Sequence, residues 1–174
     1  MPSSCVQARA VLEGPYPDFE YSIHTIPRTH KDEVSAMFPG VSTDDMLVVP
    51  TCQRSAVDLV EWGDDAAKEK DKLLVQFQKL AKAVCDALIA EGHWADYIDP
   101  CSGLPMIHKE GNTVYGEVQA LVTLLGYSTQ NAGCCSVLLH PVWGSSVYPA
   151  SFFAKAPVEV VARVVKEQAR ALSH

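Results

Sequence analysis

The pair Cys134-Cys135, preceded by Gly133, is the most specific chemical feature of the sequence. A cysteine thiolate is a soft donor that suits a soft, polarizable metal centre. A glycine at the entrance of a strand lets a bulky ligand approach the backbone closely, which fits a macrocycle better than a small substrate. These three residues therefore predict a site where one sulfur meets a large, metal-containing ligand.

The two sulfurs are not expected to serve the same ligand. Residues 134–140 read as a strand, in which successive side chains point to opposite faces. One face is wholly apolar and consists of Cys135, Val137 and Leu139; the other consists of Cys134, Ser136, Leu138 and His140. We therefore predict that Cys135 is a buried core thiol and that Cys134 is the reactive cysteine. A vicinal disulfide is a strained alternative, because extended neighbours aim their sulfurs apart.

The predicted ligand site comprises Gly133, Cys134, Ser136 and His140, with Cys134 as the metal ligand. No Lys or Arg lies nearby in the sequence, so a lower thiol pKa must come from His140, from backbone amides or from the metal itself. In fact no Asp, Glu, Lys or Arg occurs from Val118 to Ala154. Such a stretch is typical of buried central strands, or of a neutral docking surface.

The other candidate residues give weaker indications of a functional site. Asp96 and Asp99 are either an acid/base pair or carboxylates that cap a turn, and the turn is favoured. Cys101 lies in the same predicted turn, exposed and without a partner that would make it a nucleophile. The common enzyme motifs and the paired Cys or His spacing of zinc sites are absent from the sequence, so we predict no catalytic residue.

The elements that must position these residues follow from hydrophobic periodicity and turn signals. Strands are expected at 19–26, 46–49, 56–62, 93–98, 134–140 and 146–153, with a turn at 52–55 and a polar loop at 128–131. Helices are expected at 30–38, 66–91, 116–125 and 158–172. The intermixed order predicts an α+β fold, a central and mostly antiparallel sheet with helices packed on it.

Length and composition set the class of protein. The 174 residues, 48% of them hydrophobic, suffice for one domain, which we place at 19–174 after a flexible N-terminal segment at 1–18. A formal net charge of −7 argues against nucleic-acid binding. No apolar run approaches the roughly 20 residues that span a bilayer, and no signal peptide is evident. The six cysteines are expected to be reduced, in an intracellular protein.

Two segments carry a family resemblance: Ala90 to Leu104, which includes Gly92-His93-Trp94, and Leu125 to Gly144, which includes Gly133-Cys134-Cys135. They resemble the cobalamin-trafficking CblD family, also called methylmalonic aciduria and homocystinuria type D proteins, and the resemblance covers nearly the whole chain from Phe19 onward. It implies a fold like that of nitro-FMN reductases without the flavin site, and a non-enzymatic role as an adaptor.

The same resemblance implies partners and a ligand. The family complexes with CblC, which processes cobalamin (vitamin B12), and the first cysteine of its Gly-Cys-Cys motif coordinates cobalt, which carries over to Cys134. Cobalamin shared with CblC is then the expected cofactor, and no flavin is expected. Delivery is implied toward methionine synthase in the cytosol and methylmalonyl-CoA mutase in mitochondria. No nucleic acid or membrane partner is implied.

The chain departs from the family pattern in two places. Family members usually carry a long leader that bears on mitochondrial routing, whereas this sequence starts close to the predicted domain. We therefore expect a cytoplasmic protein, and a mitochondrial one where the full-length protein has such a leader. Cys101 also stands where the family more often has serine. Two alternatives remain: a flavin-dependent reductase, against which the sequence lacks an evident Arg or Lys cluster for the flavin phosphate, and a structural scaffold in which no single cysteine matters.

Overall fold

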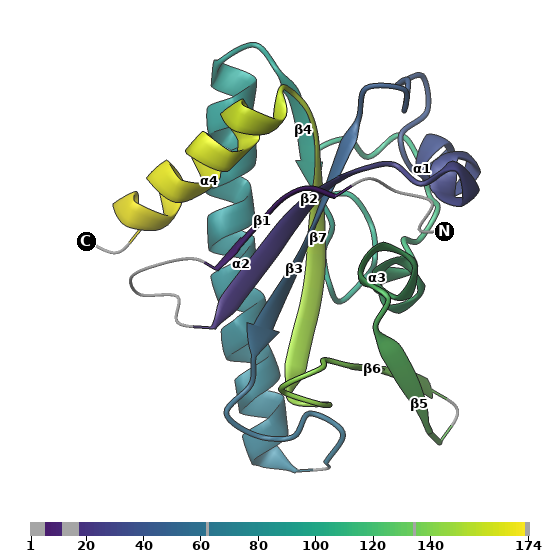
Figure 1. Cartoon of the computed structure of the whole chain (residues 1–174), viewed down its shortest axis with the longest axis vertical. Helices are drawn as coiled ribbons and strands as arrows, with labels where there is room; N and C mark the ends of the chain where they lie inside the picture. The colour runs from purple at the N-terminus through teal and green to yellow at the C-terminus, as the bar shows by residue number, and fades with distance from the viewer. Residues whose placement is uncertain (1–5, 12–17, 62, 134, 173–174) are drawn as a thin grey trace.

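The computed structural model describes residues 6–11, 18–61, 63–133 and 135–172, which form an α+β fold of three layers (Figure 1). The middle layer is a five-stranded sheet in the order β1 (Val6–Val11), β2 (Phe19–Thr25), β3 (Leu47–Arg54), β7 (Val147–Lys155) and β4 (Trp94–Tyr97). All neighbouring strands pair antiparallel. The predicted fold class is therefore confirmed.

Helices cover both faces of this sheet. On one face lie α2 (Asp64–Ala90) and α4 (Val158–Ala171); on the other lie α1 (Lys31–Met37), which follows a short 3-10 turn, and α3 (Glu117–Leu125). A separate two-stranded hairpin, β5 (Ser128–Ala132) and β6 (Cys135–Leu139), leaves the α3 side of the molecule (Figure 1). The four predicted helices are all confirmed, with shifts of a few residues at their ends.

The long helix α2 forms because apolar residues recur at helical spacing on the side that meets the sheet. Its buried stripe consists of Leu73, Phe77, Leu80, Val84 and Leu88, the residues that periodicity had placed there. Gly92, just past the helix, has a φ of 90°, a conformation that favours glycine. The stripe packs with valines of α4 and with inward residues of β2, β3 and β7 in one core.

A second core lies beneath α1 and α3 and is rich in aromatic rings. Phe38 meets Trp94 and Phe153 edge to face, at centroid distances of 4.8 and 5.3 Å. Tyr115 meets Phe153 in the same way at 5.3 Å. Such pairs stabilise beyond the area they bury, so the sheet is held firmly between its two helical layers.

Strand β3 corrects the prediction of a turn at 52–55 between two strands. The strand runs unbroken to Arg54, and residues 56–61 form bends and turns rather than a strand; Trp62 lies outside the described residues. The polar side chains at this point of the strand are buried and bonded: Gln53 Nε2, within the predicted turn, donates to the carbonyl oxygen of Leu73 at 2.9 Å, and Thr51 Oγ1, just before it, donates to that of Ala150 at 2.7 Å. Because these bonds satisfy the polar groups, the strand tolerates them inside the core.

Two strands were not predicted. The polar segment 128–131, expected as a loop, is most of β5, which pairs with β6 along its whole length. Strand β1 lies within the N-terminal segment that was expected to be flexible, and it pairs antiparallel with β2. Residues 128–131 lack the apolar alternation that identifies a half-buried strand, whereas in β1 the apolar Val6, Ala8 and Ala10 do alternate with polar residues. Within the described ranges, no helix is both long and apolar enough to cross a membrane.

Candidate functional site

The hairpin β5–β6 carries the residues to which the sequence assigned chemistry. Ser128 lies opposite Leu139 at its base, and Ala132 lies opposite Cys135 at its far end. Gly133, which follows β5, has a φ of 65°, a left-handed conformation that favours glycine. The glycine thus allows the chain to turn at the end of the hairpin.

Cys134 itself lies outside the described residues. Its neighbours in the chain, Gly133 and Cys135, are both exposed, as is Ser136. The candidate site is therefore defined by the residues around Cys134, at the end of the hairpin that is farthest from its base.

The exposure of Cys135 corrects the prediction that it is a core thiol. The alternation of the strand was predicted correctly, but the buried face is the other one: Leu138 and His140 are 3% and 5% exposed. Leu138 packs with Cys52, Leu121 and Val147 in a small third core between α3 and the sheet. The apolar face that includes Cys135 is left half-buried or exposed.

His140 fastens the hairpin to the sheet. Its Nε2 lies 2.9 Å from Glu20 Oε2 on β2, and its side chain is 3% exposed against 32% for Glu20. Its ring stacks on Trp143 at a centroid distance of 4.0 Å and an interplanar angle of 10°, and it meets Tyr127 edge to face at 5.4 Å. This one imidazole therefore joins β2, the start of β5 and the turn after β6.

The hydrogen bonds of His140 fix its tautomer. Nδ1 accepts from the backbone N–H groups of Val142 at 3.0 Å and Trp143 at 3.1 Å, so the proton is assigned to Nε2, which donates to Glu20. His140 and Gly144 also exchange two backbone hydrogen bonds of 2.9 Å. Since both ring nitrogens are engaged, the ring positions the hairpin and has no free nitrogen to take a proton from a thiol.

Sequence reasoning missed Glu20, Tyr127 and Trp143 as parts of this site. Trp143 stands three residues after His140 in the uncharged stretch, which is a weak local signal. Glu20 stands 120 residues before His140, and no local pattern connects the two. The pairing follows from the sheet, because Glu20 lies opposite Cys52 in the β2–β3 register and so shares the face that α3 covers.

The two candidate carboxylates near β4 have structural roles. Asp96 is fully buried, and its Oδ1 and Oδ2 accept the backbone N–H groups of Ile107 and His108 at 2.9 and 2.8 Å. Burial raises the pKa of Asp96, and these N–H groups act against that rise. Asp99 accepts from the N–H of Cys101 and the hydroxyl of Ser102. The turn-capping interpretation is confirmed for both.

A half-buried carboxyl, that of Glu117, also lies at the start of α3 and faces the sheet. The Ser151 hydroxyl on β7 donates to Glu117 Oε1, and Ser151 is fully buried. Burial raises the pKa of Glu117 from 4.5 to about 7, although the hydrogen bond from Ser151 lowers it in part. The protonation of this group therefore changes near neutral pH while the fold holds it in place.

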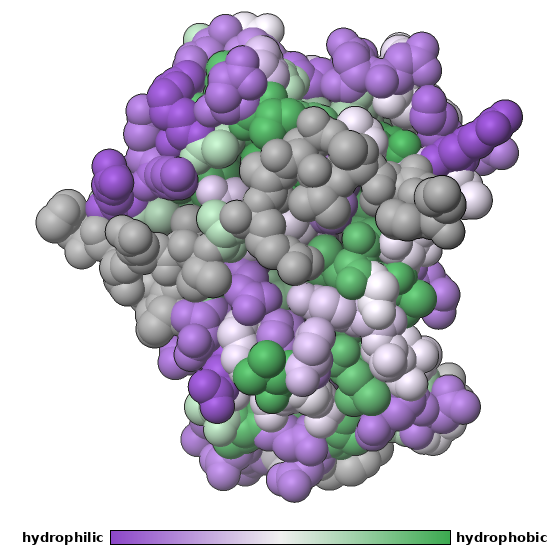
Figure 2. All heavy atoms as spheres, in the orientation of Figure 1, coloured by the Kyte–Doolittle hydropathy of each residue, from purple (hydrophilic) through white to green (hydrophobic). Residues whose placement is uncertain are grey.

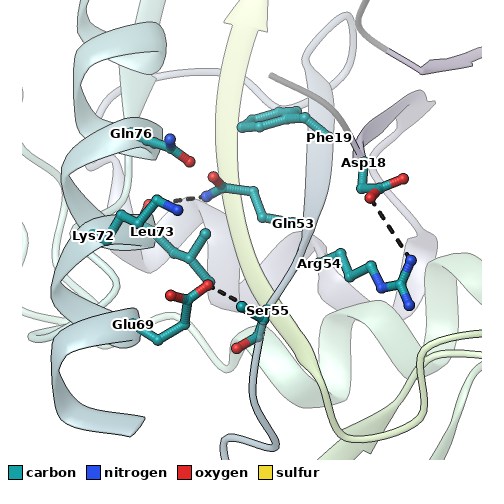
Figure 3. Close-up of a pocket in the computed structure, with 10 residues that line it drawn as sticks. Asp18, Phe19, Gln53, Arg54, Ser55, Glu69, Lys72, Leu73 and Gln76 are labelled. Atoms are coloured by element: carbon teal, nitrogen blue, oxygen red, sulfur yellow. Dashed lines mark hydrogen bonds and ion pairs between the residues drawn. The ribbon is translucent and has the colours of Figure 1, made fainter. Parts of the chain in front are cut away.

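A pocket of about 420 Å³ lies on the other face of the sheet, between the end of β3 and the first half of α2 (Figure 3). Arg54 and Asp18 face each other across it at 3.8 Å, and Glu69 accepts the N–H of Ala56 at 2.9 Å. Lys72 and Gln76 line its α2 side. Because the hairpin packs on the α3 face, this pocket is separate from the cysteine site.

A metal-binding cluster of three or more His, Cys, Asp or Glu does not occur in the described part of the chain.

Known proteins give this geometry a context. The sequence matches the family described as methylmalonic aciduria and homocystinuria type D protein over residues 8–166. It is 34% identical over 140 residues to the cobalamin trafficking protein CblD of Rattus norvegicus, which covers 80% of this chain and 47% of that protein. The identity to the protein of the same name is 34% over 137 residues in Homo sapiens and 32% over 137 residues in Gallus gallus, in each case 79% of this chain and 46% of the relative. The chain thus spans about half the length of the curated relatives it matches.

Proposed function

The chain belongs to the methylmalonic aciduria and homocystinuria type D protein family, and from this premise we propose that it is a non-enzymatic adaptor in cobalamin trafficking. In this proposal CblC holds the corrin, Cys134 donates a thiolate to the cobalt, and the cargo passes toward methionine synthase and methylmalonyl-CoA mutase. The same proposal places the protein in the cytoplasm, and in mitochondria for a form with a leader. It also includes a fold of the nitro-FMN reductase type that does not bind flavin.

The observation that carries the proposal is the place of the Gly-Cys-Cys motif in a family of cobalamin trafficking proteins. Gly133 and Cys135 flank Cys134 at the exposed end of a hairpin that leaves the body of the molecule. An exposed hairpin end suits a donor that must reach a metal held by another protein. A deeply buried cysteine would not reach a cobalt that CblC still holds.

The neighbouring residues then have distinct roles. Gly133 leaves room for the corrin to approach the backbone, and Ser136 contributes a hydroxyl close to the motif. His140 holds the base of the hairpin through Glu20, so its role is to position the hairpin. In this proposal activation of the thiol comes from the cobalt itself, because metal coordination favours the thiolate.

A spectroscopic comparison of two neighbouring serine variants tests this assignment. Wild type, Cys134→Ser and Cys135→Ser are each mixed with CblC and cob(II)alamin, and visible absorption and paramagnetic resonance spectra are recorded. Wild type and Cys135→Ser should give a thiolate-ligated cobalt species, whereas Cys134→Ser should not, because a serine hydroxyl stays protonated and is a hard donor. A Cys101→Ser variant controls for the other exposed thiol.

Two results would contradict the proposal. An unchanged spectrum from Cys134→Ser would remove the coordination step. A purified protein that is yellow and releases flavin on denaturation would favour the reductase alternative. The isolated chain is also expected to bind free cobalamin weakly, since one sulfur offers one bond and the corrin needs a pocket; tight binding in calorimetry without CblC would contradict the adaptor role.

A further inference from the structure

Strand β5 exposes a row of uncharged polar side chains. Ser128, Thr129, Gln130 and Asn131 are all exposed, and Ser136 of β6, which lies opposite Asn131, is exposed too. None of these residues is charged, in a protein of which 20% of the residues are. In the space-filling view, the lower right of the molecule, where Figure 1 places the hairpin, shows purple and pale surface next to green surface (Figure 2).

The polar groups of this row have no partner within the described protein. The side chains of Thr129, Gln130, Asn131 and Ser136 make no hydrogen bond to any residue in the described ranges. The structure therefore gives them no role in holding the fold. Two carboxamides and two hydroxyls remain available to a ligand, and each can both donate and accept a hydrogen bond.

The lack of charge on β5 is unusual for its position. An edge strand presents unpaired backbone groups, and soluble proteins commonly protect such edges with charged side chains, above all lysine. The two-stranded sheet has β5 as one of its edges, and none of its five residues is charged. A neutral edge of this kind is suited to a ligand whose own hydrogen-bonding groups are neutral.

We propose that β5 and the adjoining end of β6 recognise the carboxamide side chains around the corrin ring, with Asn131 and Ser136, which are cross-strand partners on one face of the hairpin, as the contacts. This inference rests on the proposed function, because it takes the ligand of Cys134 to be cobalamin. Carboxamides are neutral and pair with other carboxamides through one donor and one acceptor on each side. A charged side chain in the same place would lose its hydration without meeting an opposite charge.

The proposal gives the hairpin a second task beside cobalt coordination. A sulfur–cobalt bond recognises the metal but does not recognise the ring that holds it. Contacts from Asn131 and Ser136, on either side of Cys134 in the sequence, would add affinity for the corrin rim and fix its orientation relative to the thiolate. Discrimination between corrins with different rim groups would then depend on the hairpin.

The first test replaces the amide of Asn131 by a carboxylate of nearly the same shape. Wild type and Asn131→Asp are titrated into CblC loaded with cob(II)alamin, and the protein concentration that gives half of the thiolate–cobalt signal is measured. Asn131→Asp should need on the order of tenfold more protein, because the carboxylate lacks the amide's donor and is desolvated unpaired. Gln119→Glu, at an exposed position of α3, makes the same chemical change off the hairpin and should titrate like wild type.

The second test changes the ligand. Cobalamin with one rim carboxamide hydrolysed to a carboxylate should bind Asn131→Lys better than wild type, while unmodified cobalamin should favour wild type. If the hairpin contacts the surface of CblC instead, each variant will shift the titrations of both corrins equally, and that result overturns the proposal.

The outcomes separate this inference from the proposed function. If wild type gives the thiolate–cobalt signal and Asn131→Asp titrates at the same concentration, the rim contacts are refuted and the coordination by Cys134 stands. If wild type gives no such signal, the proposed function fails, and the recognition of the corrin rim fails with it.

Discussion

Replacing His140 by alanine should loosen the hairpin and lower the stability of the whole domain. The substitution removes the Nε2–Glu20 hydrogen bond of 2.9 Å, the Nδ1 acceptor of two backbone N–H groups and the stacked contact with Trp143 at 4.0 Å. A hydrogen bond to a charged group contributes about 1.5 to 3 kcal/mol, and an aromatic pair about 0.5 to 1.5 kcal/mol beyond its buried area.

These contributions do not simply add. The Glu20 side chain is 32% exposed, so water replaces part of the lost bond, whereas the imidazole is almost fully buried and leaves a void. We therefore expect His140→Ala to lower the free energy of unfolding by about 2 to 4 kcal/mol, as measured by urea denaturation. Amide hydrogen exchange in β5 and β6 should accelerate more than exchange in β3, since the bonds that are lost hold the hairpin.

Two further variants make the measurement specific. Glu20→Gln keeps an acceptor oxygen for Nε2–H, so it should cost less than about 1 kcal/mol. His93→Ala removes a half-buried histidine whose side chain has no hydrogen bond to a described residue, and it should stay within about 0.5 kcal/mol of wild type. If His140→Ala costs no more than His93→Ala, the anchoring role assigned to His140 is wrong.

Three other substitutions test separate parts of the structure. The folded-state pKa of Glu117 is raised from 4.5 to about 7, so folding favours the protonated carboxyl and its contribution is lost as the pH rises through that window. Glu117→Gln should therefore raise the free energy of unfolding at pH 8 by on the order of 1 to 3 kcal/mol and change it little at pH 4.5; an equal effect at both pH values would contradict the assignment. Asp96→Ala leaves the backbone N–H groups of Ile107 and His108 without their acceptor and should cost about 3 kcal/mol or more in urea denaturation, so a cost below 1 kcal/mol would argue against that role. Cys135→Ser changes an exposed side chain and should leave the melting temperature within about 1 to 2 °C of wild type. A large drop in melting temperature would instead support the prediction from the sequence that Cys135 is buried.

The parts of the fold that the sequence predicts well are those in which the local pattern and the burial agree. Helix α2 has apolar residues at helical spacing for its whole length, and its stripe from Leu73 to Leu88 is buried as predicted. Strand β7 is apolar along most of its length and lies inside the sheet. In such elements a residue's own type and spacing determine where it lies.

The prediction fails where a distant partner makes a polar residue acceptable. Gln53 belongs to a polar segment that was predicted as a turn, and Thr51 stands just before it, yet their hydrogen bonds to Leu73 and Ala150 keep both of them inside β3. The carbonyl oxygens that accept these bonds are supplied by β7 and α2, 99 and 20 residues away in the sequence. A pattern that covers a few neighbouring residues contains no information about such partners.

The assignment of faces in β6 fails for the same reason, and it bears directly on the site. Alternation separates Cys135 from Leu138 correctly, but both faces of the strand contain apolar residues, so the alternation alone does not determine which of them is buried. The choice is made by Glu20, which binds His140 from a strand 120 residues earlier and draws the face of Leu138 against α3. Cys135 is exposed as a consequence. The expectation that Cys134 is the ligand thus cannot rest on Cys135 being buried; it rests on the family motif, and the two serine variants decide it.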